Sequence, residues 1–287
     1  MGDVMDRVSG RLFCFGMPKC GTTSVATLLD AHPAICMHNQ KEPGDFLRKP
    51  AKTRLSGYAV TDETRWLADF TTTYGLRGNR DRFFAALHSA RIAPEKARYI
   101  LCLRDPSELG RSYLRHIAER RSLDLTAQIN FIRAEILSAC DFEGAVTCLE
   151  RKAGAASVFV VRFDDLMGKT AQRQLASALY DWLGLAPYGD IAQVWANVAG
   201  STSRYPSALD RVAGALRRTD LVRSLSPQNR ARIRRFFSRS SNEQPVPPGL
   251  MEETLAWLEE QDLVKRSRAV LARIPVGPLG AGHDSPK

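Results

Sequence analysis

The chain has 287 residues, of which 41 are Lys or Arg and 31 are Asp or Glu, so its formal net charge is +10. A hydrophobic content of 44% is enough to bury a full core, which excludes a disordered chain, and no apolar run reaches the ~18–20 residues of a membrane span. The N-terminus lacks the pattern of a secretory signal and positive charge is in surplus, so we expect a cytoplasmic protein with an anionic partner.

Short apolar runs alternate with helical periodicity along the first two thirds of the chain. Runs without polar alternation, typical of strands buried on both faces, cover 11–15, 99–103 and 157–161, with weaker candidates at 34–37 and 66–70. Apolar residues at helical spacing cover 21–31, 106–121, 129–136 and 175–183. This alternation predicts an α/β fold with a central parallel sheet flanked by helices.

The C-terminal third is predicted to be helical. We expect a single domain over 1–273, with an α/β core over about 11–185 and a helical C-terminal region over about 186–273. Helical stretches are predicted near 208–218, 227–238 and 251–272. The last residues, 274–287, contain several Gly and Pro and are expected to be a disordered tail.

The six cysteines contain no C-x-x-C pair and no adjacent cluster of histidines. We therefore expect neither a metal site nor a disulfide framework. Cys14 and Cys102 lie inside apolar runs and are expected to behave as small buried hydrophobic residues.

A glycine-containing loop, Phe15 to Ser24, joins the first predicted strand to the first predicted helix. Glycine permits a tight turn there, and the amides at the helix N-terminus form an anion-binding site. Gly16 and Gly21 have the spacing of the nucleotide-binding loop G-x-x-x-x-G-K-[ST], but Thr22 replaces its lysine. Lys19 lies inside the loop instead, where it suits a 5′-phosphate and charge on a leaving group. The alternative is that this segment is only a tight strand-to-helix turn.

The string Pro18-Lys19-Cys20-Gly21-Thr22-Thr23-Ser24 resembles the 5′-phosphosulfate loop of sulfotransferases that use 3′-phosphoadenosine 5′-phosphosulfate (PAPS), a P-x-[SKC]-G-T-T-x pattern. The resemblance implies a fold like that of P-loop NTPases. It also implies that Lys19, Cys20 and the segment 21–24 (Gly21, Thr22, Thr23 and Ser24) hold the 5′ side of PAPS. Lys19 would contact the bridging oxygen that becomes the leaving phosphate.

A second motif, Arg104 to Tyr113, follows the strand predicted at 99–103. Asp105, Pro106 and Glu108 are typical of a helix N-terminus with a capping box, which accounts for them without any ligand. Arg104 and Ser112 remain, at the carboxyl edge of a parallel sheet where open α/β folds bind ligands. Their spacing matches the family's R-[ND]-P-x₅-S-x-[YF] motif, which implies a role in binding the 3′-phosphate of PAPS.

Sulfuryl transfer needs a base that removes the acceptor proton. The segment from His32 through Lys41, Glu42 and Asp45 resembles the "H-P … K-E-P-H-F-F" stretch of bacterial and heparan-type members. That resemblance implies Glu42 as the base and Lys41 as a supporting cation. The family's histidine two residues after the glutamate is Gly44 here, so His38 is the rival candidate and His38 or Asp45 could tune Glu42. Alternatively, Lys41 and Glu42 are a solvated charge pair, and His32 is a helix-end residue.

Three further stretches resemble the family more loosely. The segment 69–74 resembles the "E-K-[ST]-P-x-Y" stretch beside cofactor and acceptor, with Thr72 in place of Pro, or else it is a strand end followed by a turn. The segment 160–166 resembles the largely structural "R-Y-E-D-L" strand end. Around Asn197, Val198 and Arg204 the resemblance implies contacts with the adenine and 3′-phosphate, with Arg204 as the candidate.

These observations together predict a PAPS-dependent sulfotransferase of bacterial type that requires no metal and releases 3′,5′-ADP. Its acceptor would be a small molecule or glycan with a hydroxyl or amine; the segment 120–154 and the C-terminal helices are expected to face it. A P-loop nucleotide kinase or NTPase is the alternative, disfavoured by Thr22. A basic nucleic-acid-binding protein is a third possibility, disfavoured because the charges are dispersed and few aromatic residues lie among them. The acceptor's identity and the oligomeric state stay open.

Overall fold

The computed structural model describes residues 8–40, 42–48, 57–120, 125–189, 203–204, 239–240, 246–247 and 249–280. A central sheet has the strand order β2-β3-β1-β4-β5-β8, and its first five strands are parallel. Their bounds are β1 Gly10–Gly16, β2 Ile35–Met37, β3 Trp66–Asp69, β4 Arg98–Leu103 and β5 Val158–Arg162. All five were predicted, and the nearly continuous burial of β1, β4 and β5 confirms that both of their faces are covered.

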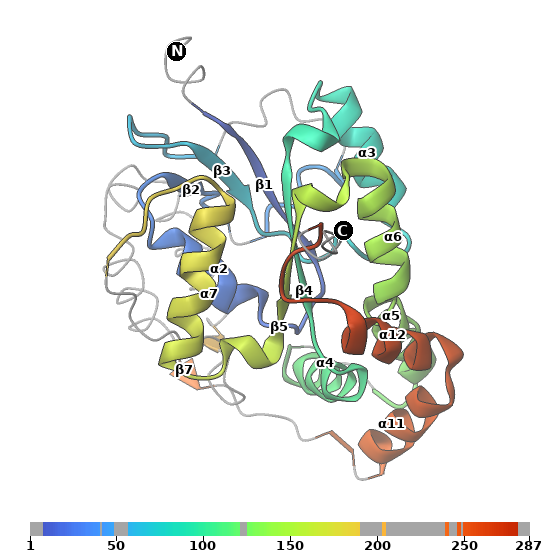
Figure 1. Ribbon diagram of the computed structural model, residues 1–287. Helices are drawn as coiled ribbons and strands as arrows, with labels where there is room; N and C mark the ends of the chain where they lie inside the picture. The colour runs from blue at the N-terminus through green and yellow to red at the C-terminus, as the bar shows by residue number, and fades with distance from the viewer. Residues whose placement is uncertain are drawn as a thin grey trace, which may run out of the picture.

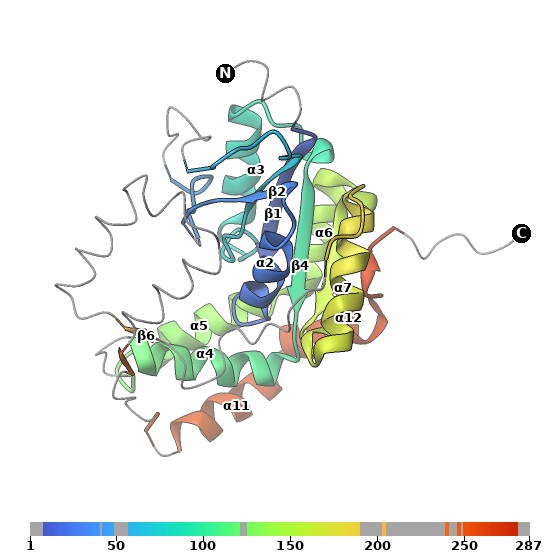
Figure 2. The ribbon, with the colours of Figure 1, turned by 90° about the vertical axis from the view of Figure 1, so that its left-hand side faces the viewer.

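Helices cover both faces of this sheet. They are α2 Thr22–Asp30, α3 Arg80–Ser89, α4 Pro106–Arg120, α5 Ile129–Ala139, α6 Phe142–Ala153, α7 Lys169–Trp182, α11 Leu250–Glu260 and α12 Asp262–Arg273, with short 3₁₀ turns at Pro94–Lys96, Ala155–Ser157 and Phe163–Leu166. Figure 1 shows α2 and α7 on one side and α3 and α6 on the other, with α4, α5, α11 and α12 below. In Figure 2, α4 and α11 run across beneath the carboxyl ends of the strands. The predicted α/β fold with a helical C-terminal region is confirmed.

Two helices, α3 and α6, lie outside the predicted elements. Both are short, and each is held by burial of a few residues, Phe83 and Leu87 in α3 and Phe142 and Leu149 in α6. A largely buried ion pair joins them, because Arg80 Nη1 lies 2.8 Å from a carboxylate oxygen of Asp141. What the segment 120–154 does for an acceptor stays a prediction.

The C-terminal region differs from the prediction in two ways. The stretch predicted at 251–272 is two helices, because Gln261 adopts an extended conformation between α11 and α12. The tail expected to be disordered from residue 274 is ordered to Gly280: Gly277–Pro278 forms β8, antiparallel to β5, and Leu279 N donates to the Val158 carbonyl. The open edge of β5 supplies these partners, which local composition could not reveal. The helices predicted at 208–218 and 227–238 lie outside the described residues.

Short strands β6 Ser203–Arg204 and β7 Arg239–Ser240 form a separate antiparallel pair. None of the helices in the described part of the chain is long and apolar enough to span a bilayer.

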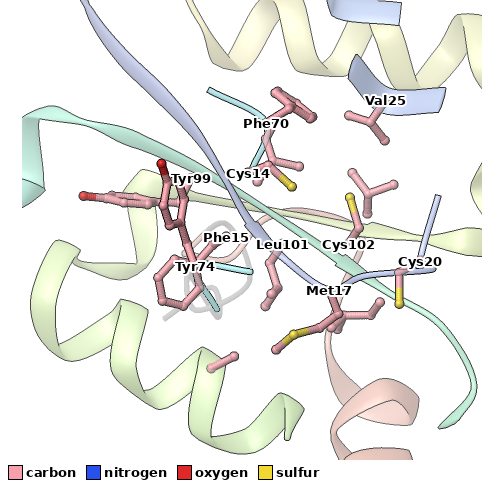
Figure 3. Packing of buried hydrophobic residues seen from close by; sticks show 14 of the residues in the cluster. Cys14, Phe15, Met17, Cys20, Val25, Phe70, Tyr74, Tyr99, Leu101 and Cys102 are labelled. Atoms are coloured by element: carbon pink, nitrogen blue, oxygen red, sulfur yellow. The ribbon is translucent and has the colours of Figure 1, made fainter. Parts of the chain in front are cut away.

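The core is rich in aromatic and sulfur-containing side chains (Figure 3). The Phe13 ring lies 5.1 Å from Phe46 and 5.2 Å from Phe83, measured between ring centroids. Cys14 and Cys102 are fully buried, as predicted from their apolar surroundings. This packing fixes the ends of β1, β3 and β4 relative to one another, and all three end at the same edge of the sheet.

Candidate functional site

The loop between β1 and α2 folds back through two residues with left-handed backbone conformations. Lys19 has φ 67° and Gly21 has φ 83°. The left-handed conformation favours glycine at position 21, and a side chain there would also crowd Leu166 Cδ1. Ser24 N donates to the Gly21 carbonyl at 2.9 Å, which begins the helix. The predicted turn from strand to helix is confirmed.

This turn presents the N-terminus of α2 toward the carboxyl edge of the sheet. The first amides of a helix have no intrahelical partner, and the positive end of the helix dipole lies behind them. The first turn of α2 carries no acidic residue that would oppose an anion. Thr22 and Ser24 are buried, while Lys19 and Thr23 are partly exposed. The arrangement is chemically suited to an anionic group.

The side chain of Cys20, unlike those of Lys19 and Thr23, is fully buried. Its thiol is fully buried in the core (Figure 3), and this burial raises its pKa well above the ordinary value. The prediction that Cys20 helps to hold a cofactor therefore concerns its backbone, because its side chain is part of the hydrophobic core.

Arg104, at the end of β4, joins the two predicted motifs. Its Nη1 donates to the carbonyl oxygen of Lys19 at 3.4 Å. The guanidinium carbon lies 3.9 Å from the centroid of the Phe163 ring, and Nη2 lies 3.5 Å from a carboxylate oxygen of Glu108. The aromatic face and the carbonyl hold the guanidinium at the edge of the glycine loop. Phe163 belongs to the "R-Y-E-D-L"-like segment, and its contact with Arg104 was not predicted.

The N-cap predicted at Asp105 is confirmed at the start of α4, whereas the Glu108 side chain of the predicted capping box faces arginines instead. One carboxylate oxygen of Asp105 accepts from Ser107 N at 2.9 Å and from Glu108 N at 3.2 Å. The Glu108 carboxylate faces Arg104 and Arg111, at 3.5 and 3.4 Å. Ser112 lies further along α4 and is partly exposed; its contact with a phosphate stays a prediction.

The two candidate bases have different surroundings. Glu42 lies on the loop after β2, and its side chain is exposed, without a hydrogen bond or ion pair to the described residues. The His38 side chain is only 6% exposed. Its Nδ1 accepts from Gln40 N at 3.0 Å, and its Nε2 lies 3.7 Å from an Asp45 carboxylate oxygen. Lys41, predicted to support Glu42, lies outside the described residues.

A buried carboxylate, Asp69, ends β3 between these loops and is 1% exposed. It accepts hydrogen bonds from Thr71 N, Thr71 Oγ1 and the Tyr74 hydroxyl at 3.0, 2.7 and 2.6 Å. Burial raises the pKa of Asp69, and the hydrogen bonds from Tyr74 and Thr71 oppose that rise. Burial and the nearby Asp69 also raise the pKa of Tyr74. The segment 69–74 was singled out by resemblance, but its hydrogen-bond network was not predicted.

Arg204 and His32 also lie in segments for which the sequence predicts a role. Arg204 lies in β6, and its side chain is outside the described part of the structure. His32 is a buried helix-end residue, as predicted: its Nδ1 accepts from Ala34 N and its Nε2 contacts the Ala186 carbonyl, both at 3.1 Å. A pocket beside it opens at the amino-terminal edge of the sheet, away from the residues described above.

Along the carboxyl edge, the predicted residues therefore occupy consecutive strand ends. The Glu42 loop follows β2, the Asp69 segment follows β3, the loop of Lys19 follows β1 and Arg104 follows β4. A direct contact is recorded between Lys19 and Arg104. No contact among the described residues joins the Glu42 side chain directly to Lys19 or Arg104.

Comparison with known proteins gives a likeness of fold to solved structures. No protein-family model matches the chain, and no curated protein sequence matches it. Among solved structures, the chain is similar to the crystal structure of a sulfotransferase from Alicyclobacillus acidocaldarius. The TM-score is 0.51 and the identity is 18%, over 71% of this chain and 90% of that one. At this identity the likeness shows a shared α/β fold and nothing further.

Proposed function

We propose that the chain is a PAPS-dependent sulfotransferase that moves a sulfuryl group to a hydroxyl or amine and releases 3′,5′-ADP. The observation that carries this proposal is the contact between Arg104 and the Lys19 loop, which brings two anion-binding motifs to one place. PAPS carries anionic groups on both the 3′ and the 5′ side of its ribose. The fold shared with a protein described as a sulfotransferase supports the same proposal.

The residues at the carboxyl edge fit such a donor. The segment 21–24, with its left-handed Gly21 and helix amides, would hold the 5′ side together with Lys19. Arg104, fixed against Phe163, would hold the 3′-phosphate with Ser112 and Arg204. Bound PAPS would supply a sulfuryl group on a phosphate leaving group, without any metal required.

The chain's own groups would handle the proton and the charge. The Glu42 carboxylate would accept the proton of the attacking hydroxyl or amine. The Lys19 ammonium would offset negative charge on the oxygen released from sulfur. Glu42 suits this role because its carboxylate is exposed, whereas the His38 ring is enclosed by Gln40 and Asp45.

The same residues give less support to the alternative, a nucleotide kinase or NTPase. Thr22, at the position of the nucleotide-binding lysine, is buried at the start of α2. A nucleic-acid-binding role is supported by the net charge of +10 alone. The acceptor is proposed to be a small molecule or glycan.

A thermal-shift comparison of nucleotides tests this proposal. We expect 3′,5′-ADP to raise the Tm more than 5′-ADP, because only the former has a phosphate for Arg104. A ligand at a hundred times its Kd adds about 2.7 kcal/mol to the free energy of unfolding, which is a measurable shift. The variant Arg104→Met should remove the advantage of 3′,5′-ADP while leaving any stabilisation by 5′-ADP.

The outcomes separate the candidate functions. Equal stabilisation by 3′,5′-ADP and 5′-ADP would contradict the sulfotransferase proposal. Stabilisation by ATP that requires Mg²⁺ would favour the kinase or NTPase instead. Binding of duplex DNA that falls steeply with salt would favour a nucleic-acid-binding protein.

A further inference from the structure

Two hydrogen bonds, each from a backbone amide to a side-chain hydroxyl, attach the loop that carries Glu42 to the segment after β3. Gly44 N donates to Thr71 Oγ1 at 2.9 Å, and Phe46 N donates to the Tyr74 hydroxyl oxygen at 3.4 Å. These two amides lie two and four residues after Glu42. Since the Glu42 side chain has no partner among the described residues, the backbone of its loop sets where its carboxylate lies.

Both accepting hydroxyls are themselves oriented by Asp69. Thr71 Oγ1 donates to one carboxylate oxygen at 2.7 Å, and the Tyr74 hydroxyl donates to the other at 2.6 Å. The amides of Gly44 and Phe46 can only donate, so the single proton of each hydroxyl is directed toward Asp69. The oxygen of each hydroxyl is then left to accept from the loop amide. The direction of the whole network follows from the donating loop amides at one end and the accepting oxygens of Asp69 at the other.

The segment after β3 also packs tightly against the end of β1. A side chain at Gly75 would overlap the Phe15 carbonyl oxygen, and a Cβ at Gly16 would lie 3.1 Å from the Thr72 carbonyl. One turn therefore touches both the Glu42 loop and the strand that leads into the Lys19 loop. Its position fixes the backbone of one loop relative to the root of the other.

Burying a carboxylate costs free energy that an apolar side chain of similar volume would not cost. We propose that Asp69 is a positioning residue, which orients the hydroxyls of Thr71 and Tyr74 so that they hold the Glu42 loop at Gly44 and Phe46. The proposal rests on the proposed function for the role of Glu42 as base. The hydrogen-bond network itself does not depend on that role.

Thr71→Val removes one hydroxyl and preserves the shape of the side chain. We expect hydrogen exchange at the Gly44 amide to accelerate about two- to tenfold, the loss of one hydrogen bond. The kcat for conversion of PAPS to 3′,5′-ADP, measured with water as the acceptor, should fall about 10- to 100-fold because the base is displaced. The Kd for 3′,5′-ADP should stay within about twofold, and Thr71→Ser should restore both the exchange rate and kcat.

Two more variants test whether the effect is specific to the network around Asp69. Asp69→Asn places an amide donor against one hydroxyl, which reverses one arm of the network, and should accelerate exchange at Gly44 or Phe46. Thr64→Val is the matched control, because Thr64 is 2% exposed at the other end of β3 and its hydroxyl accepts from Thr61 N at 3.0 Å. It should lower stability without changing exchange at Gly44 or kcat.

The proposal is overturned if Thr71→Val folds and exchanges Gly44 at the wild-type rate. It is equally overturned if exchange accelerates and kcat is unchanged, or if Thr64→Val lowers kcat as much as Thr71→Val. Failure of the proposed function is a separate result: wild-type protein would then neither bind 3′,5′-ADP nor consume PAPS. In that case the exchange rates still decide whether Asp69 holds the loop.

Discussion

Glu42 and His38 lie on the same loop, yet the hydrogen bonds around them suit them to different tasks. Nδ1 of His38 contacts the backbone of Gln40 and Nε2 faces Asp45, so both ring nitrogens already have partners. This ring would have to break existing contacts before it could accept a proton from a substrate. The exposed carboxylate of Glu42 makes no hydrogen bond or ion pair with the described residues.

Glu42→Gln should therefore lower kcat far more than His38→Ala. Loss of a general base costs about 10²–10⁴ in rate, whereas loss of a residue that only supports the loop costs less. The measurement is PAPS turnover at saturating donor, with the Kd for 3′,5′-ADP as the control for intact binding. Near-full turnover by Glu42→Gln with unchanged binding would show that the base is another residue.

At the scale of elements, the ends of β4 and β5 meet beside the proposed anion site. The Phe163 ring supports the Arg104 guanidinium on one side and packs beneath Gly21 on the other, where a Cβ would lie 3.2 Å from a ring carbon. The 3₁₀ turn Phe163–Leu166 thus shapes both the glycine loop and the cation next to it. The end of β5 therefore contacts both of the predicted motifs through Phe163.

Phe163→Leu should weaken binding of 3′,5′-ADP about 2- to 30-fold, the range that corresponds to loss of a cation–π contact. Binding of 5′-ADP should change little, because Arg104 is proposed to meet the 3′-phosphate. Phe159→Leu is the matched control: Phe159 is a buried ring on the preceding strand, β5, and packs on Trp182. Titration calorimetry measures both nucleotides, and equal weakening of the two would contradict the assignment of Arg104.

Across the whole molecule, the C-terminal helices are tied to the start of α4. Arg268 of α12 lies 3.2 Å from Asp105, the residue that caps α4, and also pairs with Glu259 of α11. Ser107 Oγ donates to Glu259 at 2.5 Å. The helical region therefore supports the strand end that carries Arg104, and the two parts should unfold together.

This tie predicts a dependence of stability on pH. Hydrogen bonds from Arg268 and Ser107 lower the pKa of Glu259 to about 2, from an ordinary 4.5. The stabilisation is complete above pH 4.5 and is lost as the pH falls toward 2, because the folded state must then bind a proton that the unfolded state already holds. Solvent screens this exposed pair, so the effect is modest.

Glu259→Gln removes the titrating group. Urea unfolding at pH 6 and at pH 3.5 should show a smaller loss of stability on acidification in Glu259→Gln than in the wild type. Parallel losses in the two proteins would mean that other carboxylates account for the acid sensitivity. Glu253→Gln, on the same helix, is a matched control that should follow the wild type.

Local patterns were enough to predict much of this protein. The uninterrupted apolar runs of β1, β4 and β5 indicated strands covered on both sides, and a parallel sheet follows from their alternation with helices. Gly21 indicated the turn before α2, and Asp105 and Pro106 indicated the start of α4, because each acts on its immediate neighbours in the chain. The likeness of fold to a solved sulfotransferase agrees with these predictions.

Only the tertiary structure shows the contacts between segments that are distant in the sequence. Strand β8 depends on the open edge of β5, the support of Arg104 depends on Phe163, and the hold on the Glu42 loop depends on Asp69. Each joins residues that are separated by tens of positions or more, or depends on the direction of a hydroxyl proton. No periodicity or capping signal records such contacts, because they arise only when the folded chain brings those segments together.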